Sequence, residues 1–394
     1  MPTDQIVRPA PPLRTALIAI LLVAGFVVST VWLAPVWALA VDAVLALSGV
    51  VLFRGPRWRT GSLLLASFFA SFAIAEAFFH VLAEPALNRN MTKIDTPSHW
   101  NVSDDVVGYR PEPGVSVDVV GKFHDEVIYH KTYTIEPSGA RLTPGSATSG
   151  PTYLFIGDSY IFGEGLNDNE TLPSQFAQHL AAPAHVVNLG VLGYSPAHLV
   201  RAIETGLYDK YIVGKVAAVI TWSTPLQMPR VIGDGGWLGN SPRFVLDQAG
   251  KLHHTGTFDG HRWRDPAAGA WFLARTYLAS AARAAEADVE REQADLYVAL
   301  VARLQQLVRE RYKAPLVLVY DWPEKDIEGQ LDVRFVPIFK RIRTLDTPMV
   351  PVRRIIGHSE EWHNFFIAHD GHPNARLDAL VAQDVLKELQ LPTR

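Results

Sequence analysis

Cysteine is absent from the sequence. Disulfide bonds, thiolate metal sites and cysteine nucleophiles are therefore excluded, although the redox compartment stays open. Excess positive charge is also missing, because 36 Lys and Arg stand against 40 Asp and Glu, with a net charge of -4 and a pI near 6.4. Since nucleic-acid-binding surfaces are usually basic, this composition does not indicate nucleic acid as a partner.

Metal and cofactor motifs are lacking as well. His253, His254 and His261 lie close together in the chain, but they lack a compact ligand spacing such as His-x-x-x-His. We therefore expect neither a metal nor a cofactor.

Long apolar runs occur only between residues 15 and 83. The stretch 15–53 is too long for one span of about 20 residues, and Pro35 supplies a break, so we expect spans at about 15–33 and 36–53. A third span is expected from about 62 to 82. Such a series does not fit a cleaved signal peptide, which has a single short apolar core.

Positive charges indicate how these spans are oriented. Arg8 and Arg14 precede the first span in a proline-rich tail, residues 1–14, and Arg54, Arg57 and Arg59 lie between the second and third. Both basic segments belong on the cytoplasmic side. Three crossings then place the rest of the chain outside the cytoplasm, which for a bacterial inner membrane is the periplasm. Two spans would leave the second basic segment outside, so we favour three.

Ionisable residues inside the expected spans are Asp42, Glu76 and His80. Charge within a membrane is costly and suggests a function by default. Glu76 and His80 are four residues apart and share a helix face. We favour the alternative of a polar face packed against a neighbouring helix, and the role of these residues stays open.

The region after the spans divides into a linker, residues 84–98, and a small unit, residues 99–149. Alternation in 115–120 and 127–135, with glycine and proline between the runs, predicts antiparallel β structure for this unit.

From residue 150 to 394, short apolar strands alternate with amphipathic helices. The expected strands are 153–156, 185–189, 216–221, 315–320 and 349–353. The expected helices are one ending near 180, 195–213, two within 270–312, 335–342 and 375–389. Four or five parallel strands with helices on both faces predict a flavodoxin-like three-layer α/β/α core.

Ser159 has the setting of a nucleophile. It follows the apolar run Tyr153–Ile156, which ends at Gly157, and ligands gather at the carboxyl ends of such buried parallel strands. Serine alone is a weak nucleophile and requires a base, an orienting acid and oxyanion donors. Asp370-Gly-His-Pro-Asn374, just before the last expected helix, offers an acid and a base.

Gly157-Asp-Ser159 and Asp370-x-His372 resemble the first and last sequence blocks of the GDSL/SGNH hydrolase family. The resemblance covers roughly residues 150–394. Each motif alone is also a common turn sequence. Their joint order, with Asn188-Leu-Gly-Val-Leu-Gly193 between them, favours the catalytic interpretation.

The resemblance implies an SGNH-type core and a triad. Ser159 would be the nucleophile, His372 the general base and then acid, and Asp370 the residue that orients His372. Many members place the acid three residues before the histidine, where this chain has His369; the position of Asp370 is a variant also seen in the family. Asp158 is expected to be structural.

The resemblance also implies an oxyanion hole that includes the backbone N–H groups of Ser159 and Gly193. The family's third block should supply an asparagine as a further donor, but this chain reads Thr221-Trp-Ser-Thr-Pro-Leu-Gln. Spacing does not choose among the replacements. The candidate third donors are Ser223, Thr224 and Gln227.

Two further features leave alternatives open. Gly139 to Arg141 resembles a Gly-x-Arg near the end of the β unit in membrane-tethered members; Arg141 would bind an anionic group or, as we favour, form a structural pair. Residues 228–265 are rich in glycine and aromatic side chains such as Trp237. This composition suits either a carbohydrate-binding rim or a covering loop with hairpin strands.

Together these features predict a serine-dependent hydrolase of a carbohydrate or lipid O-acyl ester, such as an O-acetyl ester, at the extracytoplasmic face of a membrane. The expected partners are this ester and the lipid bilayer. One alternative is O-acyl transfer to a cell-envelope glycan, in which a sugar hydroxyl replaces water. Another is a non-catalytic glycan-binding relative, which the missing third-block asparagine favours.

Overall fold

The computed structural model describes residues 13–33, 35–90, 93–96, 100–233, 235, 237–261, 287–321, 336–357 and 360–394. The described residues up to Arg89 form one compact unit, and those from Asn90 onward form the other. Residues 1–12 of the expected tail lie outside this description, as does the first of the two helices expected within 270–312.

The first unit is helical. Its helices are α1 (Leu13–Trp32), α2 (Pro35–Leu52) and α3 (Pro56–Asn90). The Ser29 hydroxyl donates a hydrogen bond to Asp42, which joins α1 to α2. The rings of Phe26 and Phe69, 5.5 Å apart, join α1 to α3.

Apolar side chains cover the outside of this unit. Ile20, Val44 and Ile74 are 64%, 66% and 72% exposed, whereas Asp42 and Glu76 are buried. Segments Pro35–Leu52 and Pro56–Phe78 are long and apolar enough to cross a membrane, and the apolar part of α1, Thr15–Ser29, is shorter. Apolar surface with polar groups inside is what a lipid environment favours.

The helices test what we expected of the ionisable residues in the spans and of the linker at 84–98. For Asp42 the favoured alternative, a polar group packed against a neighbouring helix, is what the structure shows. The side chain of His80 lies outside the described side chains. The linker expected at 84–98 is corrected, because α3 continues to Asn90 and strand β1 (Lys93–Asp95) pairs with β4.

The β unit that follows is antiparallel, as expected. Its strands are β2 (Asn101–Asp104), β3 (Gly108–Pro111), β4 (Ser116–Phe123) and β5 (Glu126–Thr134). Strands β2 and β3 pair with each other, while β1, β4 and β5 form a second sheet. Trp100 and Tyr133 of this unit pack on Phe162, which belongs to the helix that begins at Ser159.

Within the described residues, five parallel strands form the central sheet, in the order β12-β11-β8-β6-β7. They are β6 (Thr152–Gly157), β7 (His185–Gly190), β8 (Val216–Ser223), β11 (Leu316–Tyr320) and β12 (Met349–Pro351). In chain order this is the 2-1-3-4-5 arrangement of flavodoxin-like sheets. The predicted α/β class and its parallel sheet are confirmed.

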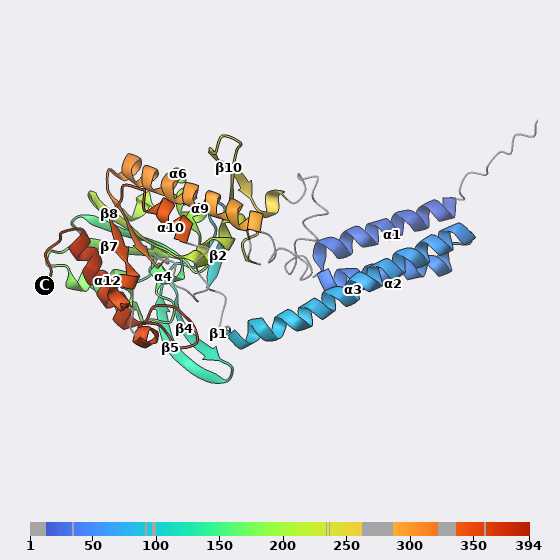
Figure 1. The fold of residues 1–394 in the computed structure, drawn as a ribbon, viewed down its shortest axis with the longest axis horizontal. Coiled ribbons are helices and arrows are strands. Elements are labelled where there is room, and N and C mark those ends of the chain that lie inside the picture. The colour runs from blue at the N-terminus through green and yellow to red at the C-terminus, as the bar shows by residue number, and fades with distance from the viewer. Residues whose placement is uncertain are drawn as a thin grey trace, which may run out of the picture. The chain divides into compact units, whose positions relative to one another are not determined.

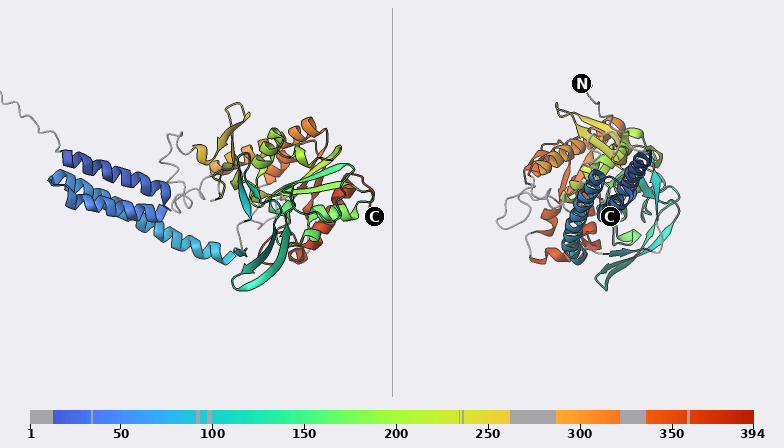
Figure 2. Two further views of the ribbon diagram at one scale, coloured as in Figure 1. Left: turned by 180° about the vertical axis from the view of Figure 1, so that it is seen from behind. Right: turned by 90° about the vertical axis from the view of Figure 1, so that its right-hand side faces the viewer.

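Helices cover both faces of this sheet (Figure 1). The helices are α4 (Ser159–Phe162), α5 (Leu172–His179), α6 (Pro196–Thr205), α9 (Ala287–Leu307), α10 (Val336–Ile342), α11 (Val352–Ile356) and α12 (Ala375–Glu388). Leu154 and Ile156 of β6 join an apolar cluster with α6 and α9, whereas Tyr153 and Phe155 join one with α5 and α12. Figure 2 shows the same separation, with α9 in orange and α12 in red on opposite sides of the sheet.

Some element boundaries differ from those expected. The helix expected at 195–213 ends at Thr205, because Gly206 follows in the left-handed conformation and caps it. The edge strand stops at Pro351, and α11 begins at once. Within 228–265 the structure has a hairpin of β9 (Pro242–Leu246) and β10 (Leu252–Thr257), as the covering-loop alternative expects.

Arg141 joins the β unit to the central domain. Its guanidinium is completely buried and donates hydrogen bonds of 2.7, 2.7 and 2.6 Å to the carbonyl oxygens of Phe162, Gly163 and Leu166. Asp168 accepts a further bond of 3.1 Å from Nε. With every face of the guanidinium used inside the protein, Arg141 has the structural role that we favoured.

We predict that Arg141→Met lowers the free energy of unfolding by about 3–5 kcal/mol, because it leaves buried carbonyls and Asp168 without their partner. Arg309→Met is the matched control, since Arg309 is 64% exposed in its ion pair with Asp346 and should cost about 1 kcal/mol or less. Urea unfolding of the full chain in detergent micelles, followed by tryptophan fluorescence, measures both. Equal losses would contradict the structural role of Arg141.

Candidate active site

Ser159 begins helix α4 directly after strand β6. Asp158 caps this short helix by accepting a hydrogen bond of 3.1 Å from the N–H of Tyr160. Helix α4 packs on the end of β7, and a Cβ placed on Gly190 would lie 2.2 Å from the nitrogen of Phe162. Glycine at this position therefore allows the close approach that fixes the start of α4 at the carboxyl edge of the sheet.

Asp158 holds this turn through more than local bonds. Its other carboxylate oxygen accepts hydrogen bonds of 2.9 Å from both Gln227 and Arg230. Asp158 is fully buried, so these bonds compensate its lost hydration. The carboxylate thus ties the Ser159 turn to the segment after β8, which agrees with its expected structural role.

His372 lies in the loop that enters α12. The N–H of Ile367 donates to the His372 carbonyl at 2.8 Å, and the N–H of Asn374 donates to that of Phe365 at 3.0 Å, so the loop is closed on itself. Asn374 caps α12 by accepting from the N–H groups of its first turn. Pro373 lies just before this cap.

The structure brings Ser159, His372 and Asp370 into one hydrogen-bonded chain. Ser159 Oγ lies 2.8 Å from His372 Nε2, and Asp370 Oδ1 contacts His372 Nδ1. The same Asp370 oxygen accepts the His372 backbone N–H at 3.1 Å, which fixes the carboxylate beside the ring. This geometry allows a proton to pass from the serine hydroxyl to an oriented imidazole.

A second carboxylate faces the same imidazole nitrogen. Glu164 Oε2 lies 3.2 Å from His372 Nε2, and the Glu164 side chain is buried. Burial raises the pKa of the Glu164 carboxyl, against the opposing effect of His372. Burial alone would lower the pKa of His372, but the carboxylates of Glu164, Asp370 and Asp158 together outweigh it and raise that pKa to about 9.

Two backbone N–H groups expected in the oxyanion hole have no acceptor among the described residues. In the part of the chain that the structure describes, neither Ser159 N nor Gly193 N donates to a carbonyl oxygen. Gly193 follows β7, the neighbour of β6 in the sheet. Both expected backbone donors therefore lie at the carboxyl ends of adjacent strands.

The candidate third donors differ in their contacts. Gln227 uses its amide nitrogen on Asp158 at 2.9 Å and on the carbonyl of Trp222 at 3.0 Å, so neither amide hydrogen is available. The Ser223 hydroxyl lies 2.8 Å from Tyr297 Oη. Thr224 is buried, and its hydroxyl has no hydrogen-bond partner among the described residues.

Trp237 is the exposed aromatic side chain beside Gly193. It is 56% exposed, and a Cβ placed on Gly193 would lie 2.6 Å from the indole nitrogen. Tyr109 Oη, which donates to the Leu192 carbonyl at 2.7 Å, borders the same glycine. By contrast Phe244, another aromatic residue of the 228–265 segment, is buried.

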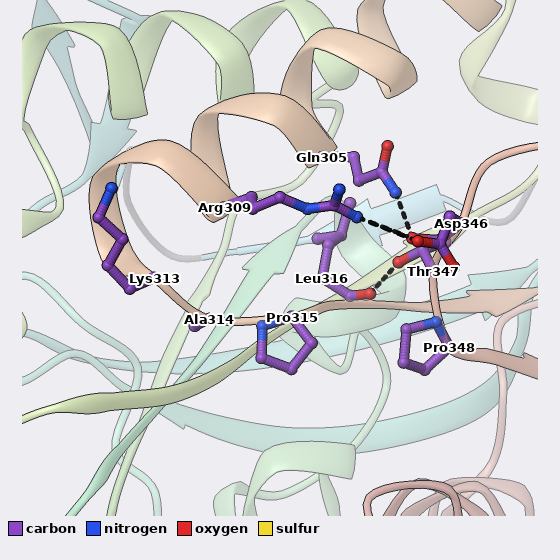
Figure 3. A pocket seen from close by; sticks show the side chains of 9 residues that line it. All are labelled: Gln305, Arg309, Lys313, Ala314, Pro315, Leu316, Asp346, Thr347 and Pro348. Atoms are coloured by element: carbon purple, nitrogen blue, oxygen red, sulfur yellow. Dashed lines mark hydrogen bonds and ion pairs between the residues drawn. The ribbon is translucent and has the colours of Figure 1, made fainter.

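An open depression of about 450 Å³ lies elsewhere, at the start of β11 (Figure 3). Gln305 donates to the Asp346 carbonyl at 2.5 Å, and Arg309 at 3.2 Å, across its rim. Because the strands are parallel, the start of β11 faces the sheet edge opposite to Ser159. This depression is therefore separate from the Ser159 site.

Glu164 and Trp237 were not singled out as site residues by the sequence. Glu164 carried a usable signal, since an acidic residue between Gly163 and Gly165, five positions after the nucleophile, lies in the same turn. For Trp237 the only sequence signal was the aromatic-rich composition of residues 228–265. Its position beside Gly193 depends on the path that this segment takes in the fold.

Three solved structures are similar to this chain. A member of the lipolytic protein G-D-S-L family from Veillonella parvula is 13% identical and covers 60% of this chain and 97% of its own, with a TM-score of 0.35. A lipase from a goat rumen metagenome is 10% identical; the match covers 61% of this chain and 97% of the lipase, with a TM-score of 0.36. A carbohydrate esterase family 2 enzyme with a carbohydrate-binding domain, from Corynascus thermopiles (Myceliophthora fergusii), is 14% identical, with 76% and 91% covered and a TM-score of 0.33.

The sequence itself matches no family model and no curated protein. The three structural matches cover about 60–76% of this chain.

Proposed function

We propose that this chain is a serine-dependent ester hydrolase in which Ser159, His372 and Asp370 form a catalytic triad. The observation that carries the proposal is the 2.8 Å contact between Ser159 Oγ and His372 Nε2, with Asp370 on the other ring nitrogen. A serine in this setting is the usual nucleophile for acyl transfer.

The proposed reaction has two halves. Ser159 Oγ attacks the ester carbonyl carbon while its proton moves to His372 Nε2, and the imidazolium then protonates the departing alkoxide. In the second half, water gives a proton to His372 as its oxygen attacks the acyl-enzyme, and Ser159 regains the proton as the carboxylic acid leaves. Asp370 keeps the imidazole oriented and stabilises its charged form.

The oxyanion formed in each half would be held by the N–H groups of Ser159 and Gly193. We propose Thr224 Oγ1 as the third donor in place of the asparagine that this chain lacks. Thr224 follows β8, the other neighbour of β6, so it lies at the same sheet edge as Ser159. Of the three candidates, Thr224 has the hydroxyl that no described residue occupies.

For the substrate we propose an O-acyl ester of a carbohydrate. An exposed indole beside the proposed oxyanion donor Gly193 suits the apolar C–H face of a sugar ring, while the ester carbonyl reaches Ser159. We further propose that the helices of the first unit span the bacterial inner membrane, with the Ser159 domain in the periplasm.

Fluorophosphonate labelling of the full chain in detergent, together with hydrolysis of an acetylated sugar, tests the function. Wild type should label and turn over, while Ser159→Ala and His372→Ala should lose about 10⁶-fold in kcat. His369→Ala is the matched histidine control, because its exposed ring stacks on Phe123 and not on Ser159. If a folded wild type neither labels nor hydrolyses, the catalytic proposal fails, and binding of the same sugar then tests the non-catalytic glycan-binding alternative.

Thr224→Val should lower kcat by about 10²–10³-fold with little change in KM, because the donor acts on charge that develops in the transition state. Thr224→Ser restores the hydroxyl and should recover most of the rate. Ser223→Ala serves as the neighbouring control, and its kcat should stay close to wild type. An unchanged kcat in Thr224→Val would mean that the two backbone donors suffice.

Reporter fusions test the proposed location. A reporter that is active only in the periplasm should be active after Arg394 and silent after Arg59, which lies between the second and third expected spans. A cytoplasmic reporter should give the opposite pattern. Periplasmic activity at Arg59 would overturn the three-span arrangement.

A further inference from the structure

Glu164 is a buried acidic residue that has no role in the triad mechanism. Its Oε2 lies 3.2 Å from His372 Nε2, the atom that receives the serine proton. Ser159 Oγ lies 2.8 Å from the same nitrogen. Two oxygen atoms therefore compete for one imidazole position.

This geometry permits few protonation states of His372 and Glu164. A neutral imidazole whose Nδ1 hydrogen bonds to Asp370 presents a lone pair at Nε2, which a bare carboxylate at 3.2 Å would repel. The contact is favourable when one proton lies between Nε2 and Glu164, with either group carrying it. The pair therefore titrates as a unit, and its apparent pKa belongs to both residues.

The other charged or titratable groups around this pair come from several elements. They are Asp158, Tyr160, Tyr129, Tyr133, Arg230 and Asp378. Arg230 is engaged with Asp158 at 2.9 Å, and Asp370 is already bonded to Nδ1. Glu164 is thus the carboxylate that acts directly on Nε2.

We propose that Glu164 is a fourth catalytic side chain, which shares the Nε2 proton of His372 and withholds the base at neutral pH. The inference rests on the proposed esterase function. When the pair holds its proton, Nε2 has no lone pair for the hydroxyl of Ser159. When that proton leaves to solvent, the remaining negative charge of Glu164 makes His372 a stronger base for the serine proton.

The consequence is a distinctive dependence of rate on pH. An opposite charge in contact shifts a pKa by about 1–3 units, so removing Glu164 should move the rising limb of kcat/KM, along which His372 loses its proton, to lower pH by at least about 1 unit. More free base then exists at pH 7, and the rate rises there. In the Glu164 variants, however, deprotonated His372 is a weaker base. The plateau of kcat/KM near pH 10 is therefore lower in the variants than in wild type, and the two pH profiles cross.

The pH dependence of fluorophosphonate labelling of Ser159, in the full chain, measures this shift in wild type, Glu164→Gln and Glu164→Leu. Gln keeps the shape of the side chain, and Leu excludes a new amide hydrogen bond to Nε2. Glu388→Gln, an exposed change on α12, is the control and should keep the wild-type profile. Wild-type limbs in both Glu164 variants would overturn the proposal.

A second measurement does not depend on catalysis. Diethyl pyrocarbonate reacts with the imidazole of histidine in its unprotonated form, and its rate at His372 can be followed against pH by mass spectrometry of the digested chain. The midpoint should fall by at least about 1 unit in both Glu164 variants. If this midpoint moves but no variant labels or hydrolyses esters, the pairing stands and the esterase function fails. If Ser159 is active but the midpoint stays, only the role of Glu164 fails.

Discussion

The hydrogen bond between Ser159 and His372 joins residues 213 positions apart, and most of the second unit serves to hold its two ends. One end is fixed by the turn from β6 into α4, and the other by the loop that enters α12. These elements are linked through packing: Leu172 of α5 and Leu377 of α12 lie in the apolar cluster that also contains Phe155 of β6. A shift of about 1 Å in that packing would change the distance between Ser159 Oγ and His372 Nε2 directly.

Electrostatics explains why so many partners surround this bond. Asp158, Glu164 and Asp370 bring three carboxyl groups to the edge of one short helix, where Arg230 contacts Asp158 and the imidazole of His372 contacts Glu164 and Asp370. Asp158 is neutralised by Arg230, whereas Asp370 and Glu164 share the single imidazole of His372. Among the residues that the structure describes, Glu164 forms its ion pair with His372 and with no Lys or Arg side chain, so the imidazole is its counter-charge when protonated. Under the proposal above, such a site becomes active when the shared proton is lost to solvent.

Local sequence was sufficient for some features and insufficient for others. Ser159 and the Asp370–His372 loop were predictable because each motif stands at the junction of a strand or helix with a turn. The five-stranded sheet was predictable because its strands are short apolar runs. The structural role of Gln227 was not predictable from local sequence, because tertiary packing determines that its amide bonds to Asp158 and to the carbonyl of Trp222. The early end of α6 had a local signal in Gly206, which the apolar pattern beyond it obscured.

The β unit is best understood as part of the proposed active site. Tyr133 accepts the Gly165 N–H at 2.7 Å, and Tyr129 lies against the same glycine. Arg141 holds the Gly163 carbonyl on the other side of Glu164. Both neighbours of Glu164 are thus fixed by residues that precede the central domain in sequence. The orientation of Glu164 toward His372 therefore depends on the β unit as well as on the turn that carries Ser159.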